Sequence, residues 1–272
     1  MVAHPDDDLL FLSPDLLDSL RSGGDVCTVY LTAGDAGRAE AYWRSRMLGV
    51  RAAYANLFGS VDVWSESTWG AATSTSAATS GDRASEDRAS GPVGATVLAL
   101  QAAPRISLVF LKLPDGGAGS GFARYGHGSL HRLWTGRQGS LTCVDGSASY
   151  TRDSLTVALA ALIRSFGPDI VRTQDFLGAV GDGDHTDHHI TGYLVRRAWE
   201  QVVAPRPELV AYQDYRSANR PANVVGAALE AKRASFGAYC GHDVMVCQPG
   251  TAVPKAVFEA WIRRQYVLAR LH

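Results

Sequence analysis

The chain has 272 residues and a mass of 29.0 kDa, and 46% of its residues are hydrophobic, which allows a large core and excludes a disordered or fibrous protein. The 26 Lys and Arg residues nearly balance the 27 Asp and Glu residues, so the net charge of −1 gives no overall attraction to nucleic acid or to an anionic membrane. The apolar stretches are shorter than the roughly 20 residues that a membrane-spanning helix needs. We therefore expect neither a nucleic-acid partner nor an integral membrane segment.

Targeting signals and cysteines restrict the location of the protein only in part. The amino terminus lacks the basic, apolar and small-residue pattern of a secretory signal peptide, so we expect a protein that is cytoplasmic or peripherally associated with a membrane. The four cysteines lack CxxC spacing, and only Cys240 and Cys247 are close enough in the sequence to suggest a disulfide. The cysteines therefore do not decide between a reducing and an oxidising compartment.

Strand and helix signals alternate along the chain. Strands are predicted for residues 1–3, 26–32, 106–113, 169–173 and 209–212. Helices are predicted to begin at Pro14, to cover residues 42–58 and 151–166, to run from the 181–189 segment to about Trp199, and to form around residues 227–238 and 254–271. The alternation predicts a single Rossmann-like α/β domain over residues 1–272, with a mainly parallel sheet and long loop insertions.

The first strand and the first long helix each carry a further expectation. A strand of three residues is shorter than the usual length of about 5–6 residues, which favours a natural chain with more residues before Met1. Gly59 is expected to end helix 42–58. The packed face of this helix is expected to include or adjoin Leu48, Ala52, Ala55 and Leu57.

Two insertions interrupt the alternating pattern. The first, at about residues 65–91, is predicted to be mobile because residues 71–91 consist of Ala, Ser, Thr, Gly and charged side chains, which bury little apolar surface. The second, at about residues 116–139, follows the turn Pro114-Asp115-Gly116 and is rich in glycine and aromatic residues. Both are expected to be loops of one domain rather than linkers between domains.

Two short segments concentrate histidines and carboxylates. The sequence HPDDD covers residues 4–8, and DGDHTDHH covers residues 182–189. Each follows a predicted strand, and loops at the carboxyl ends of strands in an open α/β sheet line the ligand crevice, so the two segments are expected to meet there. Imidazole and carboxylate groups suit zinc or a similar divalent metal. Helical spacing lets His185, His188 and His189 share a face, and it does not choose between His188 and His189.

The two segments match the signatures of a known family. Residues 3–8 (AHPDDD) and 185–188 (HTDH) resemble those of the PIG-L/LmbE-like metal-dependent N-acetylglucosaminyl deacetylases, with Thr186 in place of the usual proline. Within the family, the AHPDDD variant, the PDG turn and the aromatic insertion look most like the teicoplanin-type pseudoaglycone deacetylases of glycopeptide-antibiotic pathways. The chain departs from the family pattern at Asp8, where a glutamate is usual, and at Gly183, where some relatives place a tyrosine acid.

The resemblance implies a role for each residue of the two motifs. Asp6 is implied to be the general base. His185, as an imidazolium, is implied to stabilise the transition state, with Asp187 orienting it or holding its proton. A Zn²⁺ ion is implied as cofactor, because a divalent metal activates water and polarises the amide carbonyl of the substrate. The side chains that the resemblance implies as zinc ligands are His4, Asp7 and His188.

Plainer interpretations of the motifs stay open. The HPDDD turn can simply cap a helix through Asp6 or Asp8. The second motif can form an Asx-rich turn or a calcium loop, because Asp182, Asp184 and Asp187 can all present oxygen atoms to a hard cation.

Residues outside the motifs are candidate substrate contacts. These candidates are Arg44, Phe122, Tyr125 and Trp134. The helix that bears Arg44 and Arg46 can instead present both to solvent, and the aromatic residues can instead pack the loop. Tyr125 is also a candidate replacement for the tyrosine acid.

These inferences predict a zinc-dependent hydrolase that removes the N-acetyl group from an N-acetylglucosamine (GlcNAc) unit of a glycoconjugate, with a glycopeptide-antibiotic pseudoaglycone as the expected substrate. One alternative is a deacetylase of another small GlcNAc conjugate, of the thiol-biosynthesis type. Another is a sugar-binding module that holds a metal without turnover. A panel of substrates separates the two enzymes, and release of acetate separates an enzyme from a binding module.

Overall fold

A computed structural model describes residues 1–69 and 94–272 of the chain. Its helices are α1 (Asp7–Phe11), α2 (Asp15–Arg21), α3 (Glu40–Phe58), α5 (Leu130–Trp134), α6 (Arg152–Phe166), α7 (Thr186–Glu200), α8 (Gly226–Cys240) and α9 (Glu259–Ile262). Its strands are β1 (Val26–Thr32), β2 (Trp64–Thr68), β3 (Thr96–Leu100), β4 (Ala103–Leu113), β5 (Leu141–Thr142), β6 (Ser149–Tyr150), β7 (Ile170–Thr173), β8 (Glu208–Tyr212) and β9 (Val267–Leu271).

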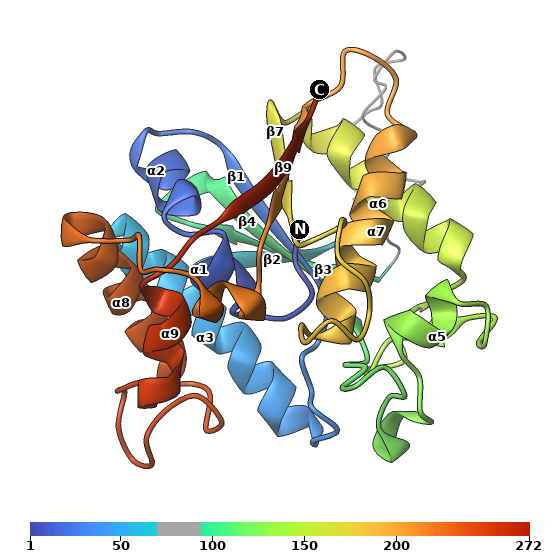
Figure 1. The fold of residues 1–272 in the computed structure, drawn as a ribbon, viewed down its shortest axis with the longest axis horizontal. Helices are drawn as coiled ribbons and strands as arrows, with labels where there is room; N and C mark the ends of the chain where they lie inside the picture. The colour runs from blue at the N-terminus through green and yellow to red at the C-terminus, as the bar shows by residue number, and fades with distance from the viewer. Residues whose placement is uncertain (70–93) are drawn as a thin grey trace.

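Two sheets lie at the centre of the molecule (Figure 1). One has the strand order β1-β4-β3-β2 and the other has the order β7-β8-β9, while β5 and β6 pair separately. Met1 and Val2 lie between the two sheets, since the Val2 amide donates to the Val29 carbonyl at 2.9 Å and the Met1 ammonium donates to the Arg172 carbonyl at 2.8 Å. The first residues of the chain therefore join β1 to β7.

The sheets are mixed, so the prediction of a mainly parallel sheet is wrong. β1 pairs with β4 and β7 with β8 in parallel, whereas β2 and β3, β3 and β4, and β8 and β9 pair antiparallel. Only Gln101 and Ala102 separate β3 from β4, and a parallel crossover needs about a dozen residues or more. The helix predicted for residues 254–271 is also wrong, because α9 is a single short turn and residues 267–271 form β9.

Alternate residues of the strands enter hydrophobic cores on opposite faces of the sheet. In β4, Ile106 and Leu108 belong to one core, and Val109 and Leu111 belong to the other. α3 and α8 cover the first face, whereas α6 and α7 cover the second (Figure 1). The two central sheets therefore lie together between two layers of helices. The carboxyl ends of the parallel strands in both sheets lie at the same edge.

The buried face of α3 agrees with the prediction at Ala55, which is in the core, and at Leu57, which packs against it, but not at Leu48. Leu48 is 42% exposed, so its predicted core contact is wrong. The face that packs on α8 instead contains Arg46, which is hydrogen-bonded in the interior, and Gly49, which admits the ring of Tyr239. Gly59 ends the helix, as predicted, in a left-handed conformation with φ of 72°.

The first predicted insertion begins in a strand. Residues 64–68 form β2, which pairs antiparallel with β3, so the sheet includes the start of the range predicted as a mobile insertion at about residues 65–91. Most of that range lies outside the described residues. The disulfide that the spacing of Cys240 and Cys247 only suggested is present, and the Cα atoms of the two residues are 5.2 Å apart. None of the helices in residues 1–69 and 94–272 combines the length and the apolar composition that a membrane crossing requires.

We predict that Gly49→Ala destabilises the protein, although alanine is normally the better helix former. A Cβ atom at residue 49 would lie 2.7 Å from the Tyr239 ring, and overpacking of this kind typically costs about 1–3 kcal/mol. Gly237→Ala on α8 is the matched control, because the nearest atom to its added Cβ would be the Ala252 carbonyl oxygen at 3.8 Å. That control should gain up to about 1 kcal/mol. Urea unfolding of both variants measures the difference, and equal stabilisation would contradict the close packing of α3 on α8.

Candidate active site

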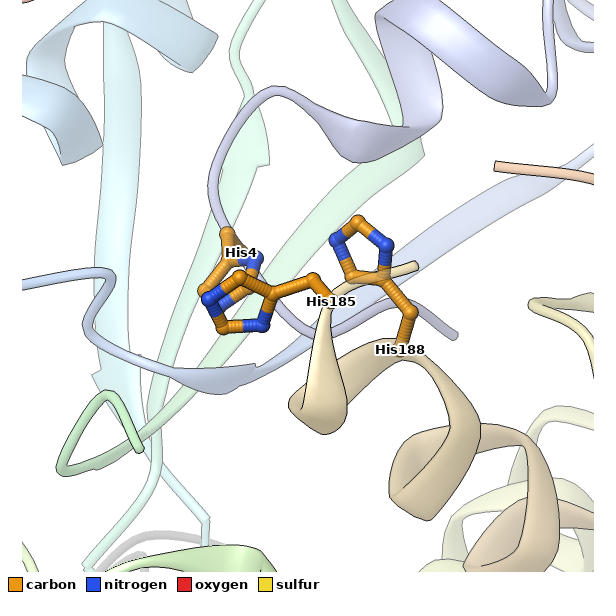
Figure 2. A group of neighbouring side chains, drawn as sticks. All are labelled: His4, His185 and His188. Atoms are coloured by element: carbon orange, nitrogen blue, oxygen red, sulfur yellow. The ribbon is translucent and has the colours of Figure 1, made fainter. Parts of the chain in front are cut away.

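The two histidine- and aspartate-rich segments meet at the carboxyl edge of the sheet. His4 lies in the turn that precedes α1, while His185 caps α7 and His188 lies in its first turn. Figure 2 shows the three imidazole rings gathered together, one from the amino-terminal turn and two from the start of α7. Each offers a ring nitrogen within 4.8 Å of the others. The topology therefore brings both motifs to one place.

Asp7 lies between His4 and His188. Its Oδ2 atom is 3.3 Å from Nδ1 of His4, and its Oδ1 atom is 3.2 Å from Nε2 of His188. All three side chains are buried. Burial acts to raise the pKa of Asp7, but the two imidazoles outweigh it and hold the pKa well below its usual range. Asp7 is therefore an ionised carboxylate between two imidazoles.

A second carboxylate holds the other ring nitrogen of each imidazole. His188 Nδ1 is 2.9 Å from Asp184 Oδ1, and His4 Nε2 is 3.4 Å from Asp187 Oδ2. A ring nitrogen that donates to a carboxylate leaves a lone pair on the opposite nitrogen of a neutral imidazole. In that neutral form both lone pairs would face the Asp7 oxygens, and such facing acceptors need a cation between them, either a proton on each ring or a metal ion. In keeping with this, His188 Nε2 is buried without a hydrogen-bond partner among the described residues.

The charge around these imidazoles favours a bound cation. Burial acts to lower the pKa of His4, but Asp7 outweighs it and the pKa rises to about 10. The pKa of His188 is also far above its usual range, despite burial, because of Asp7 and Asp214. The donor set of His4, Asp7 and His188 therefore fits a divalent metal ion, in charge as well as in donor chemistry.

His189 points away from this cluster. Its Nδ1 atom is 3.1 Å from the Asp175 carbonyl oxygen, and its Nε2 atom is 2.9 Å from Asp182 Oδ1. Asp182 also pairs with Arg216. Because both ring nitrogens of His189 have partners elsewhere, His188 is the histidine that faces His4.

The geometry does not match a calcium loop in the second motif. Asp182 and Asp184 each bind a different histidine, at 2.9 Å in both cases. Asp187 instead accepts from the Gly116 amide at 2.8 Å. The three carboxylates therefore diverge, whereas a calcium site needs them to converge.

The geometry does not match simple helix capping in the first motif either. Asp6 precedes α1 but forms no side-chain cap hydrogen bond. Asp8 points into the core, where its Oδ2 atom accepts from Tyr30 at 3.0 Å and from Tyr54 at 2.7 Å. The shorter acid at this position thus anchors α1 to β1 and α3.

Asp6 is held by Arg46 in an uncommon backbone conformation. Its φ of 144° is a region that costs a residue with a side chain about 1–3 kcal/mol. Arg46 Nη2 donates to Asp6 Oδ1 at 2.7 Å, and Oδ2 forms no hydrogen bond within the described part of the chain. Burial raises the pKa of Asp6 to about 7, against the lowering effect of Arg46. The interpretation of Arg46 as a solvent-exposed residue is wrong, since it is 7% exposed.

His185 differs from its implied charge state. Its Nδ1 atom accepts from the Asp187 amide at 3.2 Å. Burial and the charge of His4 lower the pKa of His185 to about 4, so the ring is neutral at pH 7. Its proton is then on Nε2, which lies 3.9 Å from Asp115 Oδ1. In this arrangement the ring is held by the backbone amide of Asp187 rather than by its carboxylate, and the lowered pKa favours a neutral N–H donor over the imidazolium that the resemblance implies.

Two of the candidate substrate contacts are occupied elsewhere. Arg44 is exposed and pairs with Glu40 at 2.6 Å. Trp134 packs against Tyr193, with ring centroids 5.5 Å apart, and against the core beneath α7. These contacts do not direct either side chain to the histidine cluster.

The other two aromatic candidates lie against the loop that follows β1. A Cβ atom at Gly37 would be 2.7 Å from the Phe122 ring, so the ring covers this loop closely. The Tyr125 hydroxyl donates to the Arg38 carbonyl at 2.8 Å. Because the Tyr125 hydroxyl is bound to this loop, it does not take the place of the tyrosine acid of some relatives in this conformation. The tyrosine ring beside His188 is that of Tyr215, at 4.9 Å between centroids.

Further polar residues of the site were not predicted. Gln174 Nε2 donates to Asp7 Oδ2 at 3.0 Å and to Asp214 Oδ1 at 3.2 Å. Asp115 lies beside His4 and His185. A shared signal was available, because each of these unpredicted residues comes one or two positions after a buried strand: Asp115 after β4, Gln174 after β7 and Asp214 after β8.

Comparison with known families agrees with the placement of the two motifs. A family model described as PIG-L, GlcNAc-PI de-N-acetylase, matches residues 1–199. The matched range includes both motifs and Arg46, and it ends before Asp214. A search of curated proteins returned no match.

We predict that His188→Ala loses metal, whereas His189→Ala retains it. Removal of His188 takes away the lone pair that faces Asp7, and the affinity for Zn²⁺ should fall by about 100-fold or more, beyond the typical loss of ~10–100-fold for an outer contact. His189 is the adjacent residue and the matched control. Titration calorimetry with Zn²⁺ measures both affinities, with circular dichroism as a check on folding. Loss of metal from the His189 variant alone would contradict the proposed ligand.

Proposed function

Because the chain belongs to the PIG-L family of GlcNAc-PI de-N-acetylase-type hydrolases, we propose that it is a zinc-dependent hydrolase that removes the N-acetyl group from a GlcNAc unit of a glycoconjugate. One observation carries the proposal: the Asp7 carboxylate lies between Nδ1 of His4 and Nε2 of His188, and the buried carboxyl group of Asp6 is its neighbour in the chain. A metal site and a separate proton acceptor are the components that amide hydrolysis needs.

His4, Asp7 and His188 would hold the metal ion. When bound, a divalent metal activates water and polarises the carbonyl of the scissile amide. Asp184 fixes the ring of His188 through Nδ1, and Gln174 fixes the carboxylate of Asp7 through Oδ2. These outer contacts orient the donors, and such contacts typically contribute ~10–100-fold to metal affinity or activity. Nitrogen and oxygen donors of this kind favour zinc.

Asp6 would be the proton carrier. Arg46 fixes its Oδ1 atom, which leaves Oδ2 to accept a proton from the attacking water and to deliver it to the amine as the C–N bond breaks. The amide is thereby converted to acetate and a free amine. The buried position of Asp6 keeps bulk water from competing for the proton.

His185 would stabilise the negative charge that develops on the carbonyl oxygen. Its neutral ring carries a proton on Nε2, and the Asp187 amide fixes the ring through Nδ1. A donor that is already oriented costs no reorganisation during the reaction. Asp115, 3.9 Å from Nε2, is the nearby acceptor that the N–H group would exchange for the substrate oxygen.

We propose further that the GlcNAc unit belongs to a glycopeptide-antibiotic pseudoaglycone. Support comes from the AHPDDD variant and from the glycine-rich aromatic loop at residues 116–139. Phe122 and Tyr125 of this loop contact the loop after β1, while the Gly116 amide at its start binds Asp187 in the site. Aromatic side chains beside the site give an aryl-rich aglycone ring faces and edges to pack against.

Asp6→Asn should remove most of the deacetylase activity and retain the metal. Asparagine keeps the shape of the side chain but does not accept a proton, and loss of general-base catalysis typically costs ~10²–10⁴-fold in kcat. Mass spectrometry of acetyl loss from GlcNAc conjugates measures turnover, and elemental analysis measures zinc. Asp25→Asn on the exposed surface is the control. Full turnover of the Asp6→Asn variant, or by verified metal-free protein, would refute the mechanism.

Phe122→Ala should impair hydrolysis of a glycopeptide substrate more than hydrolysis of free GlcNAc. Burial of a phenylalanine ring contributes ~1.5–3 kcal/mol, so kcat/KM for the large substrate should fall by about 10-fold or more. Trp134→Ala is the comparison, because that ring packs on the scaffold and its loss should affect both substrates in proportion. A proportional loss in the Phe122 variant as well would remove the support for an aglycone contact.

A further inference from the structure

Arg46 connects the proposed base to a distant part of the chain. Its Nη2 atom donates to the Pro5 carbonyl at 3.0 Å and to Asp6, and its Nη1 atom donates to the Gly34 carbonyl at 2.6 Å. Its Nε atom donates to the Tyr239 hydroxyl at 2.6 Å. The guanidinium is planar, so fixing one of its nitrogens fixes the direction of the others. The group that holds Nε, together with the Gly34 and Pro5 carbonyls, therefore sets the direction of the Nη2 atom that binds Asp6.

Asp243 holds the Nε side of Arg46. Its Oδ2 atom is 3.1 Å from Arg46 Nε and accepts from the Tyr239 hydroxyl at 2.7 Å. Its Oδ1 atom accepts from the Tyr42 hydroxyl at 3.0 Å and from the Met245 amide at 2.9 Å. Asp243 is 1% exposed, so both oxygens are confined to these partners. Oδ2 thus contacts Arg46 and its partner Tyr239, whereas Oδ1 contacts Tyr42 of α3 and the backbone of the loop that carries Asp243.

A disulfide closes the loop that carries Asp243. α8 ends at Cys240, and the bond to Cys247 makes residues 240–247 a closed loop with both sulfur-bearing residues buried. Inside it, the Asp243 amide donates to the Cys240 carbonyl at 2.9 Å, and the Cys247 amide donates to the Asp243 carbonyl at 3.0 Å. The backbone of Asp243 is therefore fixed from both ends of the disulfide. This loop lies outside the residues 1–199 that match the family.

We propose that the disulfide-closed loop of residues 240–247 positions the base Asp6, and that Asp243 is a positioning residue that acts through Arg46. This inference rests on the proposed function, which makes Asp6 the base. The backbone of Asp6 is strained, so its orientation depends on contacts outside its own turn. Arg46 supplies the contact, and Asp243 fixes Arg46. Residues beyond the family-matched range thus control the direction of a proton carrier within it.

Asp243→Asn tests the positioning role. The variant keeps the volume of the side chain but turns one acceptor into a donor, which then faces an N–H or O–H group of the network. Small misplacement of a catalytic group can cost up to ~10²-fold, so kcat should fall between about 10- and 100-fold while KM and zinc content change less than about twofold. Loss of zinc, or a change confined to KM, would overturn the proposal.

The same substitution in the Asp6→Asn background separates positioning from general damage. If Asp243 acts through Asp6, it has nothing left to position, and Asp243→Asn should lower kcat no further in the double variant. A loss by the same factor in both backgrounds would show that Asp243 acts independently of Asp6 and would overturn the proposal.

The disulfide is tested without changing any side chain of the network. The variant Cys240→Ser/Cys247→Ser should show the same pattern as Asp243→Asn, with kcat lowered by about 10-fold, and Cys27→Ser, a free cysteine, is the matched control that should behave as wild type. Wild-type kcat in the double-serine variant would remove the disulfide from the proposal.

A readout without turnover keeps this inference separate from the proposed function. If the wild-type protein releases no acetate, the proposed function fails, and hydrogen exchange of the peptide containing residues 4–11 then tests the positioning alone. Faster exchange in this peptide in both loop variants supports the connection through Arg46. Unchanged exchange there would overturn it, whatever the activity.

Discussion

The cost of burying unpaired charge determines how this site is built. An ionised side chain removed from water is penalised by several kcal/mol unless it finds an opposite charge or hydrogen bonds. The first turn of the chain buries three successive carboxyl groups, those of Asp6, Asp7 and Asp8, and each has a different solution. Arg46 pairs with the first, two imidazoles flank the second, and two tyrosine hydroxyls donate to the third. Because these partners come from separate elements, satisfying the charges also fixes the elements relative to one another.

The join between the two sheets carries this constraint into the fold. Residues 1–3 bridge β1 and β7, which places the HPDD turn where the two sheets meet at their carboxyl ends. The Gln174 side chain completes the join, since its Oε1 atom accepts from the Ala3 amide at 2.7 Å while its amide group donates to Asp7 and Asp214. A single neutral side chain therefore links the backbone of one motif, a candidate ligand and the residues that follow β8. The site depends on this junction rather than on either sheet alone.

The features that could be predicted from the sequence are those that depend on local residue patterns and on the order of the strands. Both motifs follow predicted strands, so their meeting was predictable, although residues 1–3 form only an isolated bridge to β1. The choice between His188 and His189 depended on partners such as Asp182, which helical spacing does not include. Arg46 was open to interpretation as solvent-exposed because an arginine on a helix is usually hydrated, and the group that accepts from its Nε atom, Tyr239, is 193 residues away. Residues 267–271 were predicted to be helical because a short apolar segment is compatible with both the helical and the strand repeat. Pairing with β8 makes them a strand.

The division between the family-matched range and the rest of the chain has a physical meaning. The groups that would hold the metal or carry the reaction all lie in residues 1–199, at or just before the starts of α1 and α7. The groups behind them come from both parts of the chain. Asp184, Gln174 and Arg46 lie within the matched range, whereas Asp214, which is 3.9 Å from the ring of His188, and Asp243, which lies behind Arg46, come from later residues. The reaction requires particular chemical groups at the positions that contact metal or substrate. The residues behind these groups need only provide a suitable charge and shape at the right place. The orientation of the reacting groups in this chain therefore depends on loops on both sides of residue 199, and the later loops reach the site through Arg46, Gln174 and the ring of His188 in the contacts described above.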